Sequence, residues 1–196
     1  MRLPEYSEVN GKRYKINTDF RTAIECNEIA IDTTIDDEER ALAIIFKLYG
    51  DEGLKDYNNH TELLKLAQKY LSCGKELKNE DTPDMDYVED MDYIEASFMS
   101  DYQIDLANTN MHWWKFNNLI NGLSNSEMGN CCVLNRIRNL RNCDPREISD
   151  TKERQKLIKA KQQVALKKYQ KPKKLPTDKQ KENAMEFLEA LGIRKE

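Results

Sequence analysis

Residues that interrupt helices are scarce in this sequence. The 196 residues include only 7 glycines and 5 prolines, too few for the many turns of an all-β fold. The sequence therefore predicts a mainly α fold. No run of about 18 apolar residues is present, so a membrane-spanning helix is not expected. Residues 1–5 also lack the apolar segment of a secretory signal, and we expect a protein of the cytoplasm.

Reactive and metal-binding motifs are also missing. The 5 cysteines are odd in number, and a chain of this length can bury a core without covalent staples, so no disulfide framework is expected. The scattered glycines form no phosphate-binding loop, and neither a G-x-S-x-G elbow nor an H-E-x-x-H pair occurs. A zinc site can be drawn from Cys131, Cys132, Cys143 and His112, but thiols packed as small apolar groups are the favoured interpretation. We predict no catalytic residue, no cofactor and no metal.

Charge is unevenly distributed along the chain. The net charge is −4 over residues 1–74, −9 over 75–106, +1 over 107–150 and +8 over 151–196. The acidic stretch contains carboxylates that can pair for acid–base catalysis, but a solvated face that attracts basic protein surfaces is favoured. The basic end suits nucleic acid or a protein, and it offers one aromatic, Tyr169, rather than a stacking platform. We expect it to contact protein.

The first part of the chain is predicted to be a β-hairpin followed by three helices. Asn10-Gly11 lies between two short strand-like segments, and a type I′ turn requires positive φ at both of these positions. The helices are expected to begin near Asp19, near Asp36 and near Thr61, the second ending at Gly50 and the third at Gly74.

A second helical unit is predicted from apolar residues at helical spacing. Its first helix has the stripe Tyr87, Met91, Ile94, Phe98 and Tyr102, and its solvent side is expected to hold Glu89, Asp90, Asp92, Glu95 and Asp101. A second helix, capped near residues 108–110, contains Trp113, Phe116, Ile120 and Leu123, and a short third helix contains Leu134 and Leu140. Two more helices are predicted over residues 151–169 and 178–191. The prolines between them cannot continue a helix, so the two are separate.

These patterns divide the chain into four predicted parts. They are a hairpin and three-helix unit over 1–74, a polar linker over 75–86, an acidic, Trp-rich helical unit over 87–150, and a basic helical tail over 151–196.

The adjacent tryptophans Trp113 and Trp114 are the strongest candidates for a partner-binding site. Neighbouring residues on a helix point about 100° apart, so one helix face buries only one of them well. We expect the exposed tryptophan, with Phe116 or Met99 beside it, to line a groove for partner helices, protected by the acidic helix. The competing interpretation is that all four side chains form the core of one small bundle.

Two segments of the sequence carry a family resemblance. One contains Asp92-Tyr93-Ile94, Ala96-Ser97-Phe98-Met99, Ile104-Asp105-Leu106 and His112-Trp113-Trp114-Lys115-Phe116; the other runs from Val9-Asn10-Gly11-Lys12 to Ile16-Asn17-Thr18-Asp19-Phe20-Arg21. With them the chain resembles, over roughly residues 1–170, a family encoded in tail modules of phages and prophages of Gram-positive bacteria.

This resemblance implies a non-enzymatic tail assembly chaperone in the cytoplasm of the bacterial host. Members are encoded beside the tape-measure gene, and they are taken to hold the long tape-measure protein soluble until tail-tube subunits polymerise around it. The implied partners are the tape-measure protein, the tail tube protein and further copies of the chain itself, rather than a membrane or nucleic acid. The alternative is a structural or DNA-contacting morphogenesis protein.

Overall fold

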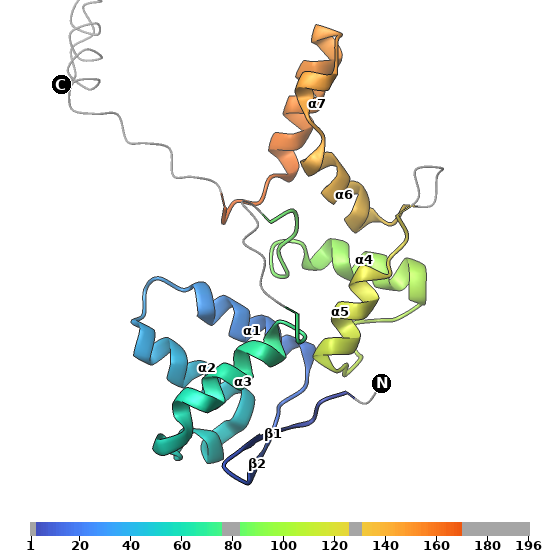
Figure 1. Ribbon diagram of the computed structural model, residues 1–196. Coiled ribbons are helices and arrows are strands. Elements are labelled where there is room, and N and C mark those ends of the chain that lie inside the picture. The colour runs from blue at the N-terminus through green and yellow to red at the C-terminus, as the bar shows by residue number, and fades with distance from the viewer. Residues whose placement is uncertain (1–2, 76–82, 126–130, 170–196) are drawn as a thin grey trace, which may run out of the picture. The chain divides into compact units, whose positions relative to one another are not determined.

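The computed structural model describes residues 3–75, 83–125 and 131–169, which are mostly helical after a small N-terminal hairpin, as the sequence predicts (Figure 1). One compact unit spans Met1–Leu166, and a second begins at Lys167. Most of the predicted linker and the predicted helix over 178–191 lie outside the described residues. In the described part, no helix is both long and apolar enough to cross a bilayer.

The hairpin forms at the position that the Asn-Gly pair predicts. Strand β1 (Tyr6–Val9) pairs antiparallel with β2 (Lys12–Lys15). The turn residues have φ values of 52° at Asn10 and 78° at Gly11, both positive as a type I′ turn requires. The inward-facing Tyr14 is buried, and its hydroxyl donates to Asp56 Oδ2 at 2.6 Å. This contact fastens the hairpin to the segment that leads into the third helix.

Three helices follow the hairpin and pack against one another: α1 (Phe20–Ile31), α2 (Asp37–Leu54) and α3 (His60–Leu71), the last preceded by a short 3-10 turn, η1 (Tyr57–Asn59). Asp19 caps α1, and Asp36 forms a capping box with Glu39 at the start of α2. Gly50 was expected to end α2, but it only interrupts the helix, with φ 65° and ψ −160°, and a last turn continues to Leu54.

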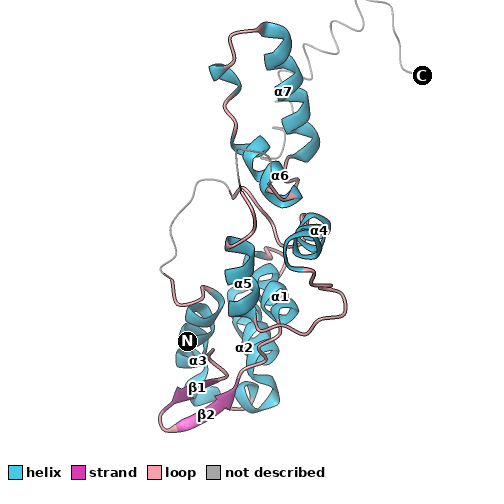
Figure 2. Cartoon of the chain, turned by 90° about the vertical axis from the view of Figure 1, so that its right-hand side faces the viewer, coloured by secondary structure: helices cyan, strands magenta, loops and turns pink. Residues whose placement is uncertain are grey.

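The second half of unit 1 contains α4 (Met91–Tyr102), α5 (Trp113–Asn121), α6 (Val133–Asn142), the 3-10 turn η2 (Pro145–Glu147) and α7 (Thr151–Val164) (Figure 2). Three expected boundaries differ. The α4 helix begins at Met91 rather than Tyr87, His112 caps α5 instead of a residue in 108–110, and α7 ends at Val164, five residues short of the predicted window.

A single apolar core connects the two halves of this unit. The Phe116 ring on α5 is fully buried, and it stacks on Phe20 of α1 with a centroid distance of 4.4 Å and on Phe98 of α4 at 5.3 Å. The expected separation into units over 1–74 and 87–150, and a tail starting at 151, is therefore wrong. The chain needs its second half to cover the apolar faces of its first.

This shared core predicts that unit 1 unfolds as one cooperative unit. Replacing Phe116 by alanine should lower the free energy of unfolding by about 3–5 kcal/mol, because a large buried ring leaves a cavity. In a urea titration, tryptophan fluorescence and far-ultraviolet circular dichroism should shift to the same lower midpoint. Two transitions, with only one sensitive to the substitution, would show that the halves fold separately.

Candidate functional site

Both tryptophans of the predicted site bind the C-terminal end of α3. Trp113 is 1% exposed, and its indole Nε1 donates to the carbonyl of Leu71 at 2.9 Å. Trp114 is half-buried, and its Nε1 donates to the carbonyl of Tyr70 at 2.9 Å. Because the last carbonyls of a helix lack partners inside it, the two indoles cap α3 from outside. One tryptophan belongs to the core, as predicted, and the other lies at its edge.

The other two predicted residues lie in opposite environments. Phe116 is fully buried at the centre of the aromatic core, whereas Met99 on α4 is 50% exposed. The expected groove lined by an exposed tryptophan and Phe116 is therefore not formed. The expectation missed that α3 ends beside α5 and supplies acceptors for both indoles. Of the four residues, only Met99 is presented openly at the surface.

The two segments that carry the family resemblance lie side by side. The amide of Phe20 donates to the carbonyl of Met111 at 2.9 Å, and the amide of Trp113 donates to the carbonyl of Thr18 at 2.8 Å. His112 extends this junction, because its Nδ1 accepts from the amide of Trp114 while Nε2 bonds the carbonyl of Pro4 at 2.9 Å. These motifs therefore build the junction between the start of α1 and the start of α5.

The outer side of α4 is a surface with apolar side chains among carboxylates. Its exposed residues recur at helical spacing and are Asp92, Glu95, Ala96, Met99 and Ser100. We call this set the α4 face. The opposite side of the helix buries Ile94, Ser97 and Phe98 in the core. The predicted acidic side is exposed at Asp92 and Glu95, with the exposed Met99 beside them, whereas Asp90, which was expected on this side, is 1% exposed.

A groove of about 710 Å³ adjoins the α4 face where α4 meets α6. Ala96 and Ser100 belong both to the α4 face and to the wall of the groove, while Val133, Arg136 and Cys131 form the other side. Buried Ser97 fixes the spacing of the helices: its hydroxyl accepts from the amide of Leu134 at 3.0 Å and donates to the carbonyl of Tyr93 at 2.7 Å. The groove and the α4 face form one continuous surface.

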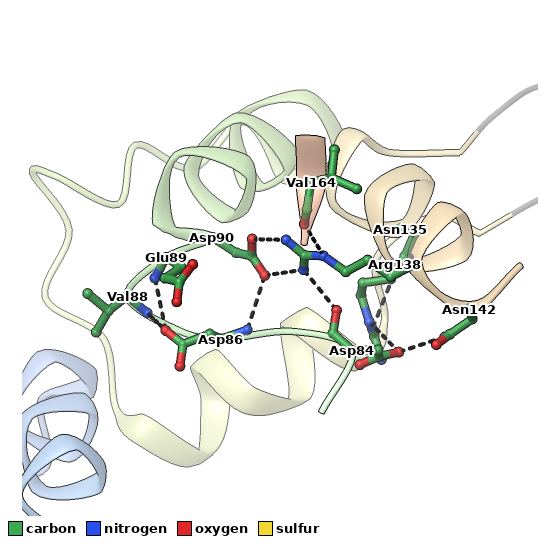
Figure 3. Close-up of polar contacts among 10 residues, drawn as sticks. Asp84, Asp86, Val88, Glu89, Asp90, Asn135, Arg138, Asn142 and Val164 are labelled. Carbon is green, nitrogen blue, oxygen red and sulfur yellow. Dashed lines mark hydrogen bonds and ion pairs between the residues drawn. The ribbon is translucent and has the colours of Figure 1, made fainter. Parts of the chain in front are cut away.

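A buried ion pair holds α6 against the segment that leads into α4 (Figure 3). The Asp90 carboxylate is 1% exposed, and Arg141 binds it through both terminal nitrogens, at 2.6 and 2.7 Å. Arg141 also donates to the carbonyls of Asp84, at 2.9 Å, and of Val164 at the end of α7, at 2.7 Å. One guanidinium therefore joins α6 to the segment before α4 and to the end of α7.

A larger hollow, of about 920 Å³, lies between the hairpin connection and α2. Two of its charged lining residues have partners, since Lys47 pairs with Glu25 at 2.6 Å and Asp19 caps α1, and the third, Lys15, is exposed. Its exposed Phe46 is surrounded by groups of both charge signs. The hollow therefore presents a less distinctive surface than the α4 face.

The cysteines that suggested a zinc site are not assembled into one. Cys132 caps the start of α6 and Cys143 follows its end, which places them about 15 Å apart along the helix axis, and His112 caps a different helix. Desolvation raises the pKa of the Cys131 thiol, which favours its protonated form. Among the described residues, no group of three or more His, Cys, Asp or Glu side chains is arranged to hold a metal ion.

Comparison with known proteins gives one result. Residues 2–166 match the family described as Bacteriophage Gp15 protein, a range that includes α1–α7 and ends with the compact unit. No curated protein and no solved structure matches the chain.

The buried ion pair yields a stability prediction with a built-in control. Replacing Arg141 by methionine should cost about 3–5 kcal/mol, because Asp90 is left as a buried unpaired charge. Replacing Arg138, whose partner Asp84 is about a third exposed, should cost about 0–1 kcal/mol. Denaturant titrations of both variants measure the difference. Equal losses in the free energy of unfolding would show that the buried Asp90–Arg141 pair stabilises the fold no more than the partly exposed Asp84–Arg138 pair does.

Proposed function

Because this chain belongs to the Bacteriophage Gp15 protein family, we propose that it is a non-catalytic tail assembly chaperone that binds the tape-measure protein. The sequence resemblance described above supplies the link to the tape measure. The α4 face supplies the physical basis, since a chaperone must expose apolar anchors and yet resist aggregation. Met99 provides the exposed apolar anchor, and the carboxylates beside it oppose aggregation.

The observation that carries this proposal is the position of Met99. It is 50% exposed on a helix whose opposite side is buried, and it lies beside a groove that can receive part of a partner helix. Methionine is flexible and polarizable, so it adapts to varied apolar side chains along a long client. Asp92 and Glu95 on the same face favour clients that carry lysine or arginine. The tail tube protein is a second partner on this proposal.

Co-expression with a tape-measure protein from the same phage or prophage tests the proposal. The unchanged chain should increase the soluble fraction of the tape measure and be recovered bound to it. Met99→Ala should weaken this binding by about tenfold or more, because it removes an apolar anchor worth about 1.4 kcal/mol. Alanine keeps the helix stable, so melting temperatures should be unchanged.

Ile31→Ala provides the matched control for Met99→Ala. Ile31 is 49% exposed at the end of α1, so the substitution removes a similar amount of apolar surface away from α4. The control should retain full capture of the tape measure. Equal capture by the two variants would remove the α4 face from the mechanism. No change in tape-measure solubility with the unchanged chain would reject the chaperone function itself.

A further inference from the structure

The groove where α4 meets α6, which we call the α4–α6 groove, has a cation on its α6 side. Arg136 lines this groove and is exposed. The other two arginines of α6, at positions 138 and 141, each pair with a carboxylate. Arg136 forms no ion pair with any residue in the described ranges. Its charge is therefore available to a partner that enters the groove.

Carboxylates lie on the α4 side of the same groove. Asp92, Ala96 and Ser100 recur at intervals of four, so they form one row along α4, and the last two line the groove. Asp92 is exposed at the start of this row. Asp101 follows the last residue of the row and also lines the groove. The amide of Ser124 donates to the Asp101 carboxylate at 2.7 Å and lowers its pKa, so this group is charged near neutral pH.

The groove keeps these opposite charges apart. Asp101 and Arg136 both lie near the Cys131 thiol: desolvation has the largest effect on the pKa of this thiol and raises it, while Arg136 opposes the rise and Asp101 adds to it. No ion pair joins Asp101 to Arg136 within the part of the chain that the structure describes. One ligand in the groove can therefore contact an acidic side and a basic side at the same time.

The surface between the charges suits the side of a helix. Ala96 and Ser100 have short side chains, so a neighbouring helix can approach their row closely. Met99 lies in the adjacent row of α4 and is 50% exposed, and Val133 lines the opposite side of the groove. An occupant therefore gains apolar contact along its centre and charge contacts along its two sides.

We propose that the α4–α6 groove binds a single client helix that is basic on one side and acidic on the other. Lysine or arginine of this helix faces Asp92 and Asp101, aspartate or glutamate faces Arg136, and apolar side chains lie between them. Only one direction of the helix along the groove satisfies both sides, so the charges also fix the direction of the client. The inference rests on the proposed function for the identity of the client, the tape-measure protein, and it specifies which of its segments bind.

Partners of uniform charge fit this groove less well. A helix that is basic on both sides places a cation beside Arg136, and a helix that is acidic on both sides places a carboxylate beside Asp101. A nucleic acid brings phosphates to the carboxylates of α4 and is repelled there. The arrangement of charges on the client, rather than its net charge, therefore determines binding.

Three synthetic peptides test this inference with the full-length chain. Each is a stapled helix of about 15 residues, or about 22 Å, with the same leucines along one face. The mixed peptide has lysines on one side of the leucines and glutamates on the other, whereas the lysine peptide and the glutamate peptide carry one charge on both sides. Fluorescence anisotropy measures each Kd. The mixed peptide should bind about fivefold or more tightly than either other peptide, because a uniform peptide meets repulsion at one side of the groove.

Arg136→Glu should change which peptide binds best. The lysine peptide should then bind about fivefold more tightly than the mixed peptide, because both sides of the groove are acidic in this variant. Position 136 is exposed in the N-terminal half of α6, where a carboxylate is compatible with the helix dipole, and circular dichroism should show an unchanged fold.

Lys115→Glu is the matched control for Arg136→Glu. It makes the same change in net charge at an exposed position of α5 that does not line the groove. This control should keep the preference for the mixed peptide. Equal affinities of the unchanged chain for the three peptides, or an Arg136→Glu variant that still prefers the mixed peptide, would overturn the proposal. Self-association of the unchanged chain that Arg136→Glu abolishes, without any preference among the peptides, would assign the groove to a second copy instead.

The peptides also separate this inference from the proposed function. The expected order of affinities, together with no capture of the tape measure by the unchanged chain, would uphold the specificity of the groove and reject the chaperone function. Equal affinities for the peptides, together with full capture of the tape measure by the unchanged chain and by Arg136→Glu, would do the reverse.

Discussion

The hydrogen bonds from Trp113 and Trp114 to the C-terminal end of α3 set the main constraint on this fold. A helix that ends inside a protein needs hydrogen-bond donors for its last carbonyls. Here the indoles of Trp113 and Trp114 supply two donors, although they lie 42 and 44 residues later in the sequence than their acceptors. Once α5 is fixed on α3, Phe116 meets Phe20 and Phe98, and the core closes. The position of α4, with its exposed outer side, follows from that closure.

Polar contacts around α6, together with the aromatic core, fix the positions of α4, α6 and α7. Ser97 ties the start of α6 to α4, and Arg141 binds Asp90 while reaching the end of α7. Both groups are inside the protein, where a polar contact is costly to break because water does not replace the lost partner. The groove therefore has walls whose spacing is determined by hydrogen bonds as well as by packing.

Local signals in the sequence were enough to predict the elements. Asn10-Gly11 identified the hairpin, Asp19 and Asp36 identified helix starts, and the apolar spacing from Ile94 to Phe98 identified α4. The division into separate units failed because the acceptors for the tryptophan indoles lie about forty residues away, and no local pattern records which helix end will lie nearby. A pair of adjacent indole donors was the available signal, since buried indoles usually find a partner.

The surface that we propose as the candidate site was likewise predictable only in part. Charge and helical spacing identified the acidic surface and Met99, but Phe116 had equal apolar character and only the fold decided that it is buried. The helical spacing wrongly placed Asp90 on the solvent side, and its pairing with Arg141 was missed because one acidic and one basic residue among many carry no pattern that marks a buried pair. Such pairing depends on three-dimensional proximity alone.

The two sides of α4 are under different physical demands, and this bears on how the protein evolves. Ile94 and Phe98 are buried in the core, and Ser97 is hydrogen-bonded to α6, so substitutions at these positions destabilise the fold. Residues 92, 95, 96 and 99 are exposed and satisfy no internal bond that the fold requires. Mutations on the outer side can therefore accumulate while the helix stays in place. A lineage can thereby acquire a new binding partner through successive surface substitutions, each compatible with the same architecture.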